Sequence, residues 1–106
     1  MALRTLTTEQ WRIVDSLEAH ARLHAVCLLA ASPGLRPTSG RRSPERNRAV
    51  GGSEGSFHLR GRAIDLTGSR LAIAAGLRTA KAQRVTHACS GPEEVIDEGD
   101  HLHIAW

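Results

Sequence analysis

The stretch Ser56-Phe-His-Leu-Arg-Gly-Arg-Ala-Ile-Asp65 combines a loop that can bend sharply with an alternating segment typical of a strand. It places an imidazole, His58, and a carboxylate, Asp65, seven residues apart. This spacing does not put them on one helical face, but Gly61 between them permits a tight bend. A loop imidazole and a strand carboxylate can then converge on one point, and zinc accepts both as ligands.

A second short stretch, Asp100-His-Leu-His103, offers the further ligand that such a site needs. Because alternate side chains of a strand share a face, His101 and His103 are expected to point the same way. One imidazole can bind a metal while the other lies beside it, and Asp100 is placed to take a proton from water. Histidines in either stretch alone more often have a structural role than a metal-binding one. When the two stretches are considered together, the structural and metal-binding interpretations are about equally favoured.

Length and composition predict one domain. At 106 residues, with 41% apolar and 24% charged residues, the chain is large enough for one modest core. Aromatic residues make up only 3%, so the core must be built from Leu, Ile, Val and Ala. We predict a single domain over residues 1–106 that works as a monomer.

The chain is basic, with a net charge of +3 and a pI of about 9.7. Five of its Arg residues lie between positions 36 and 48, and such a surface attracts polyanions of any kind. Nucleic-acid readers usually add aromatic side chains for stacking or a recognisable helical motif, and the sequence shows neither. We therefore expect no nucleic-acid partner, with a metal-stabilised nucleic-acid binder as a minor alternative.

Cysteine usage and the N-terminal region bear on the compartment. Cys27 and Cys89 lie in apolar stretches without a Cys-x-x-Cys spacing, which favours buried strand thiols over a disulfide or a ligand pair. Residues 1–24 are amphipathic and charged, unlike a signal peptide, and no apolar run reaches a membrane-spanning length. We expect synthesis in the cytoplasm without membrane insertion, with release by another component if the protein acts outside.

Hydrophobic spacing and capping signals predict the element order αββαβαββ. The expected helices span about residues 8–23, 43–50 and 69–83. The expected strands span about residues 25–30, 35–39, 62–66, 84–89 and 101–106. The run 25–30 could also be the tail of a helix. This order predicts an α+β fold with a small mixed, mainly antiparallel sheet packed against helices. The zinc site is expected at the sheet face.

Three motifs appear together in residues 36–106. Residues 56–65 complete the pattern Ser-x-His-x-x-Gly-x-Ala-x-Asp, residues 100–103 give an acid, two residues and His, and residues 38–52 supply an upstream Arg-rich segment. In this order they resemble the zinc D-Ala-D-Ala carboxypeptidase family. That family includes L-alanyl-D-glutamate endopeptidases of phage lysins, and the Hedgehog signalling domain shares its fold.

The resemblance implies a role for each matching position. His58, Asp65 and His103 would hold Zn²⁺. Asp100 would be the general base, and His101 would steady the oxyanion or the metal shell.

Two further residues receive roles at the substrate. The resemblance implies that Arg42 contacts a carboxylate or carbonyl of the substrate, and a planar guanidinium can hold a carboxylate through two parallel hydrogen bonds. Without the family, Arg42 would be interpreted as one more solvated residue of a basic run. Ser56 would orient the loop or hydrogen-bond the substrate, and a plain loop-capping hydroxyl is an equally favoured interpretation.

The function implied by the resemblance is hydrolysis of a peptide bond in bacterial peptidoglycan by a zinc metallopeptidase. The enzyme would be either a D,D-carboxypeptidase or an endolysin-type endopeptidase. Small size, high charge and the lack of a signal-peptide pattern favour a phage lysin that reaches the cell wall during phage lysis. The alternative is a phage structural or wall-binding module that keeps a zinc site with little catalysis.

Overall fold

Helix α1 (Thr8–Asp15) begins at a capping box. The Thr7 hydroxyl accepts a hydrogen bond from the N–H of Gln10 (3.1 Å), and the Gln10 side chain accepts one from the N–H of Thr7 (3.0 Å). The computed structural model, which describes residues 6–86 and 91–106, thus confirms the predicted helix start. The predicted end near residue 23 is wrong, because the chain leaves α1 at Ser16 and enters a second helix, α2 (Ala19–Ala31).

Two tertiary hydrogen bonds explain the break between α1 and α2. The N–H of Glu18 donates to the carbonyl of Gly61 (2.9 Å), and Arg41 Nε donates to the carbonyl of Ser16 (3.0 Å). In one continuous helix, these two backbone groups would bond to Val14 and to residue 20. The hydrophobic spacing continues through the break, but the helical pattern of backbone hydrogen bonds does not.

Helix α2 also corrects the strand predicted at residues 25–30, which is instead the helix tail given as the alternative. Its buried residues recur at helical spacing: Ala21, Ala25, Leu28 and Leu29. The Ala-rich composition favours this conformation. Cys27 is accordingly exposed on a helix rather than buried in a strand, and Cys89 lies outside the described residues.

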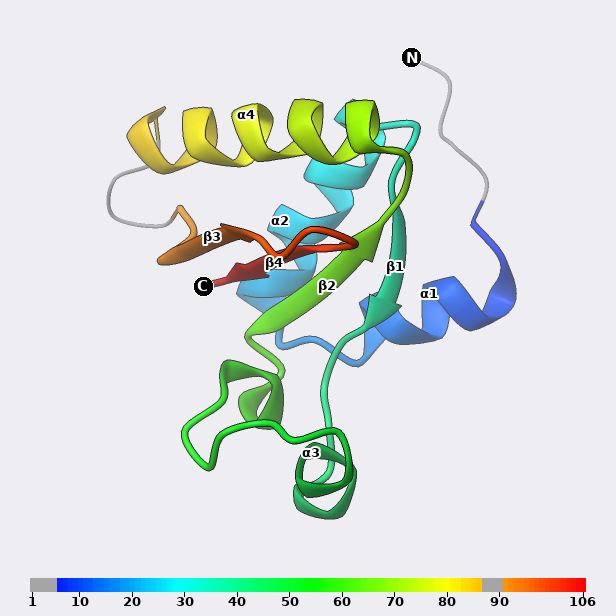
Figure 1. The fold of residues 1–106 in the computed structure, drawn as a ribbon, viewed down its shortest axis with the longest axis vertical. Coiled ribbons are helices and arrows are strands. Elements are labelled where there is room, and N and C mark those ends of the chain that lie inside the picture. Colours follow the sequence, from blue (N-terminus) through cyan, green and yellow to red (C-terminus); the bar gives the residue numbers. More distant parts are fainter. Residues whose placement is uncertain (1–5, 87–90) are drawn as a thin grey trace.

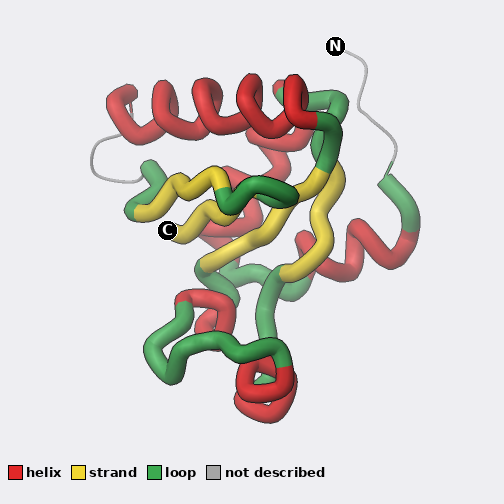
Figure 2. The backbone as a smooth tube through the Cα atoms, in the orientation of Figure 1, coloured by secondary structure: helices red, strands yellow, loops and turns green. Residues whose placement is uncertain are grey.

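The sheet has four strands in the order β1-β2-β4-β3, and each neighbouring pair is antiparallel. Figure 2 draws the strands in yellow among the red helices. The strands are β1 (Arg36–Ser39), β2 (Ala63–Thr67), β3 (Glu94–Asp97) and β4 (Leu102–Ala105). The strands expected at 35–39, 62–66 and 101–106 correspond to β1, β2 and β4, whereas β3 is additional.

The fourth helix replaces part of a predicted strand. Helix α4 (Arg70–Thr86) extends three residues beyond the expected end at residue 83, and therefore takes up the start of the strand expected at 84–89. Residues 87–90 lie outside the described part of the chain. The long connection between β1 and β2 holds α3 (Pro44–Ala49) and a 3₁₀ helix, η1 (Phe57–Arg60), at one end of the sheet (Figure 1).

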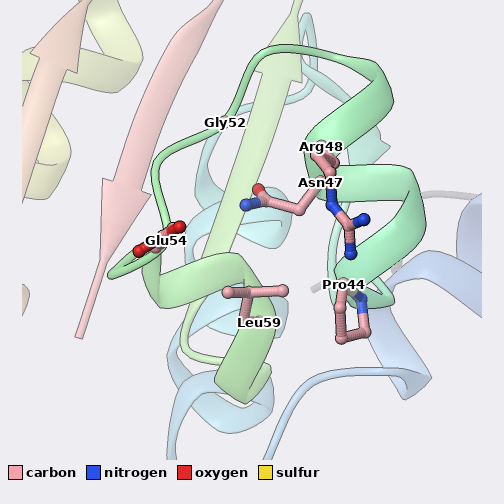
Figure 3. A pocket seen from close by; sticks show the side chains of 6 residues that line it. All are labelled: Pro44, Asn47, Arg48, Gly52, Glu54 and Leu59. Atoms are coloured by element: carbon pink, nitrogen blue, oxygen red, sulfur yellow. The ribbon is translucent and has the colours of Figure 1, made fainter.

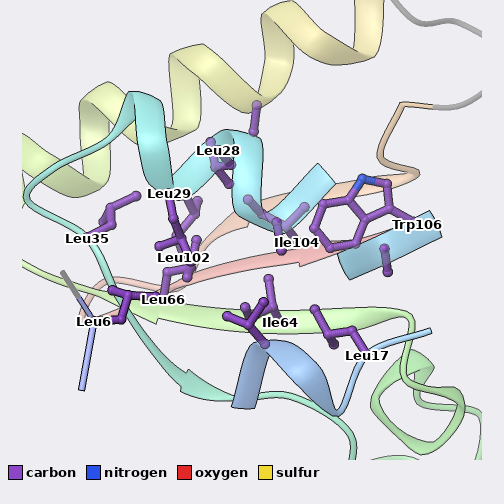
Figure 4. Close-up of a cluster of buried hydrophobic side chains, with 14 of the residues drawn as sticks. Leu6, Leu17, Leu28, Leu29, Leu35, Ile64, Leu66, Leu102, Ile104 and Trp106 are labelled. Atoms are coloured by element: carbon purple, nitrogen blue, oxygen red, sulfur yellow. The ribbon is translucent and has the colours of Figure 1, made fainter. Parts of the chain in front are cut away.

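The core lies between the sheet and helices α1, α2 and α4 (Figure 4). On the central strands it contains the even-numbered residues Ile64, Leu66, Leu102 and Ile104, all fully buried. Because strand side chains alternate, the odd-numbered residues of β2 and β4 point to the opposite face. The predicted α+β class, with a mainly antiparallel sheet packed against helices, is confirmed.

Candidate metal centre

Asp65 and His103 are direct partners across the two central strands, β2 and β4. Side chains in such a pair stand side by side on one face of the sheet. His103 Nδ1 lies 3.1 Å from Asp65 Oδ1, on the face opposite the core. The alternation that buries Leu102 and Ile104 therefore also places one imidazole beside one carboxylate.

His58 reaches the same carboxylate from η1. The hydroxyl of Ser56 caps this 3₁₀ helix by accepting from the N–H of His58 (3.2 Å), and Gly61 ends it in the left-handed region at φ 67°. The bend returns the chain to β2 and leaves His58 Nε2 3.3 Å from Asp65 Oδ2. Its ring centre lies 5.4 Å from that of His103.

These three side chains form a group that can hold one metal ion. Each offers a ligand atom, and those atoms lie within 4.8 Å of one another. Two imidazole nitrogens and one carboxylate oxygen suit Zn²⁺, and three protein ligands leave a fourth position for water or substrate. The structure thus brings together the three predicted metal ligands His58, Asp65 and His103.

The buried ring of His58 already has the tautomer that a metal needs. Its Nδ1 lies 2.7 Å from the carbonyl of Gly40, and because a carbonyl only accepts, Nδ1 must carry the proton. The lone pair is then on Nε2, which is buried and has no hydrogen-bond partner. A metal ion at this point would give the lone pair of Nε2 the partner that it otherwise lacks.

Electrostatics keep the carboxylate charged. Burial opposes ionisation of Asp65, but the hydrogen bond from His103 and the nearness of both imidazoles outweigh it and lower the pKa of the carboxyl well below its usual range. The hydrogen bond to Asp65 in turn raises the pKa of His103, against the opposing effect of burial. The group is thus built around an anion, as a cation site requires.

Arg42 lies at the edge of this group. Its Nη2 donates to Asp65 Oδ2 (3.0 Å), its Nη1 to the amide oxygen of Asn47 (3.4 Å), and its Nε to Ser39 (3.3 Å). In this structure the predicted substrate residue therefore contacts a predicted metal ligand, and it retains 16% of its side-chain exposure.

The predicted base is the most exposed member of the site. The Asp100 side chain is 91% exposed, and its Oδ1 lies 2.7 Å from His101 Nδ1. His101 Nε2 lies 4.0 Å from Asp65 Oδ1. The carbonyl of Asp100 is held by the hydroxyl of Thr67 (2.9 Å). Asp100 thus contacts His101, and His101 is the link between it and the ligand group.

Glu94 is a member of the site that sequence reasoning missed. Its Oε1 lies 3.1 Å from His103 Nε2. The residue belongs to β3, and that strand offers only Val95 and Ile96 as apolar positions, too few to reveal a period. Without the strand, no pattern connects Glu94 with His103.

One hollow is lined by Arg42, and a second is lined by Asn47, to which Arg42 is bonded. The larger, of about 460 Å³, lies between α3, the following loop and η1 (Figure 3). It is lined by Pro44, Asn47, Arg48, Gly52, Glu54 and Leu59. The smaller, of about 300 Å³, includes Arg42 itself with Arg41 and Arg46. Neither is lined by His58, Asp65 or His103; Arg42, which donates to Asp65, connects the smaller hollow with the metal group.

Fold and site together define a small α+β protein with a His-Asp-His group for one divalent cation on its sheet. The sequence matches the peptidase M15 family over residues 9–105. The chain therefore belongs to this family of metallopeptidases, whose members are generally zinc-dependent, and the predicted family is confirmed. None of the curated proteins compared with the chain matches it. Across residues 6–86 and 91–106, no helix has the length and hydrophobicity that crossing a membrane requires.

Proposed function

We propose that this protein is a zinc-dependent peptidase that cleaves a peptide bond in the stem peptide or cross-link of bacterial peptidoglycan. The observation that carries the proposal is the group His58, Asp65 and His103, whose ligand atoms lie within 4.8 Å in a chain of the M15 family. When bound there, zinc would supply a Lewis acid for the scissile carbonyl and would lower the pKa of water to about 7.

Asp100 is the general base of this proposal. The hydrogen bond and charge of His101 lower the pKa of Asp100 below its ordinary value, which keeps the carboxylate in the ionised form that can accept a proton but also makes it a weaker base. It takes that proton from the attacking water and returns it to the leaving amine. His101, 4.0 Å from Asp65, would donate a hydrogen bond to the developing oxyanion.

Arg42 and Ser56 complete the assignment. Arg42 lines one hollow and is bonded to Asn47 of the other, so its guanidinium can bind a carboxylate or carbonyl of a peptide lying between them. Ser56 orients the loop, because its hydroxyl caps η1 and so positions His58. We propose that the protein reaches the cell wall when it is released during phage lysis.

The test is digestion of purified peptidoglycan by the zinc-loaded protein, followed by mass spectrometry of the released fragments, which identifies the bond. His103→Ala is expected to lose zinc and activity together. Asp100→Ala is expected to keep zinc and to lose turnover by about 100-fold or more. Glu98→Ala, an exposed carboxylate on the same turn, is the matched control and should retain turnover.

Wild-type turnover in Asp100→Ala would contradict the base assignment. Binding to intact peptidoglycan without any released fragment, at full zinc occupancy, would contradict the peptidase and favour a wall-binding module.

A further inference from the structure

We infer that Glu94 is a positioning residue of the metal site, which holds His103 in the tautomer that binds the metal through Nδ1. This inference rests on the proposed zinc site. Its basis is the position of His103 between two carboxylates: Nδ1 lies 3.1 Å from Asp65, and Nε2 lies 3.1 Å from Glu94.

The two nitrogens of His103 face different surroundings. Nδ1 faces Asp65, whose other oxygen lies 3.3 Å from the unpartnered Nε2 of His58. Nδ1 is therefore the nitrogen aimed at the common point of the three ligands. A neutral imidazole carries one proton, so ligation through Nδ1 requires that proton on Nε2. A carboxylate that accepts from Nε2–H favours this tautomer over the other.

The sheet register explains why Glu94 can do this. Ile96 is paired with His103, and Glu94 is paired with Ala105 two residues further along β4. Residues offset by two positions share a face and lie about 7–8 Å apart, within reach of a long side chain. A Glu side chain spans this distance, whereas Asp is one methylene shorter.

His58 is held in a comparable way, but by a weaker acceptor. Its outer nitrogen, Nδ1, lies 2.7 Å from the backbone carbonyl of Gly40. Each of the two imidazoles thus has an acceptor on the nitrogen that faces away from the ligand group. Because the acceptor of His103 is an anion, it also makes that imidazole the more basic ligand.

Glu94 could instead be regarded as a rival general base to Asp100. Its contact lies at Nε2, on the other side of the His103 ring from Nδ1, so a bonded Glu94 faces away from the ligand group. The two roles make opposite predictions: a positioning residue changes metal affinity, and a base changes turnover at full metal occupancy.

The experiment measures zinc affinity by competition with a chelating dye. We expect Glu94→Ala to bind zinc about 10–100-fold more weakly than wild type. Glu94→Gln keeps an oxygen that can accept from Nε2–H and should lose less zinc affinity than Glu94→Ala. Glu93→Ala, an exposed neighbour with the same change in charge, is the control and should bind like wild type.

Two further measurements separate the roles. At saturating zinc, Glu94→Ala should turn over substrate within a few-fold of wild type, whereas Asp100→Ala should not. ¹⁵N NMR of the zinc-loaded wild type should show His103 protonated at Nε2. Equal zinc affinity in Glu94→Ala and Glu93→Ala overturns the inference, as does loss of turnover in Glu94→Gln at unchanged affinity. Unchanged affinity in His58→Ala and His103→Ala would instead contradict the zinc site itself.

Discussion

Arg42 connects several parts of the site. Its guanidinium donates to Asp65, Ser39 and Asn47, and its backbone N–H donates to the carbonyl of His58 (2.9 Å). Arg42→Lys keeps the charge but cannot form this fork. We expect a loss of about 1–2 kcal/mol in the free energy of unfolding, together with a raised KM for the peptide substrate, measured by urea unfolding and by steady-state kinetics.

Arg46→Lys is the matched control for this prediction, because Arg46 is exposed and lines the same hollow. It should leave stability and KM near wild type. If Arg42→Lys behaved in the same way, Arg42 would be one more solvated member of the basic run.

At the same scale, residue type and spacing predicted the ligand group because its chemistry is local. His58 and Asp65 are joined by a bend at Gly61, and His103 lies in an alternating stretch that must be a strand. Their roles in binding and catalysis stay predictions. Glu94 could not be predicted, since its contact with His103 depends on the pairing of β3 with β4. Cys27 was placed wrongly because an apolar run does not distinguish a strand from a helix.

The 3₁₀ element η1 depends on the conformation of Gly61. Its φ of 67° is unfavourable for other residues, and a Cβ there would lie 2.6 Å from the Arg41 guanidinium. We expect Gly61→Ala to cost about 1–2 kcal/mol in backbone strain and to displace Arg41, with weaker zinc binding through His58. Chemical unfolding and zinc titration provide the measurements.

Two other glycines separate strain from contact. Gly51 has a φ of 77° with nothing within 4 Å of an added Cβ, so Gly51→Ala carries the strain alone. Gly55 has neither a positive φ nor a neighbour within 4 Å, and Gly55→Ala should be close to neutral. Equal losses for Gly61→Ala and Gly51→Ala would show that displacing Arg41 has no cost.

The turn that carries Asp100 is tied to α4 by an ion pair. Arg70 donates to both oxygens of Asp97 (3.1 and 2.9 Å) and to the carbonyl of Gly99 (2.7 Å). The hydrogen bond from Arg70, then that from the Gly99 N–H, lowers the pKa of Asp97 to about 2. Because this lies below the unfolded value, the stabilisation is complete above about pH 4 and is lost as the pH falls.

Asp97→Asn should therefore show a smaller fall in the free energy of unfolding between pH 4 and pH 2 than wild type, by urea unfolding at each pH. Glu98→Gln, on the same turn, should follow the wild-type curve. Parallel curves for Asp97→Asn and wild type would mean that the ion pair does not persist in solution.

Element boundaries were predictable where the determinants are local. Helices α1 and α3 begin close to the predicted positions, because the capping box at Thr7 and the Ser43 cap are each satisfied within a few residues. The break at Ser16 was not predictable. It depends on bonds from Arg41 and to Gly61, which are distant in sequence and come together only in the folded protein.

For the whole molecule, the order of helical and extended patterns was sufficient to predict an α+β class, because each pattern requires a layer to pack against. The strand order β1-β2-β4-β3 was not predictable, since long-range pairing sets it. That pairing also makes the metal group a property of the folded state. Its ligands come from η1, β2 and β4, which the unfolded chain does not hold together.

Zinc should therefore stabilise the entire fold. A ligand that binds only the folded state at 100 times its Kd adds about 2.7 kcal/mol, which for a domain of this size raises Tm by about 10–20 °C. The expected result is a rise in Tm with zinc that a chelator reverses, measured by scanning calorimetry. His58→Ala should abolish the rise, whereas Asp100→Ala should retain it, because Asp100 is not a ligand in this assignment. An unchanged wild-type Tm at millimolar zinc would mean that the three side chains meet for structural reasons alone.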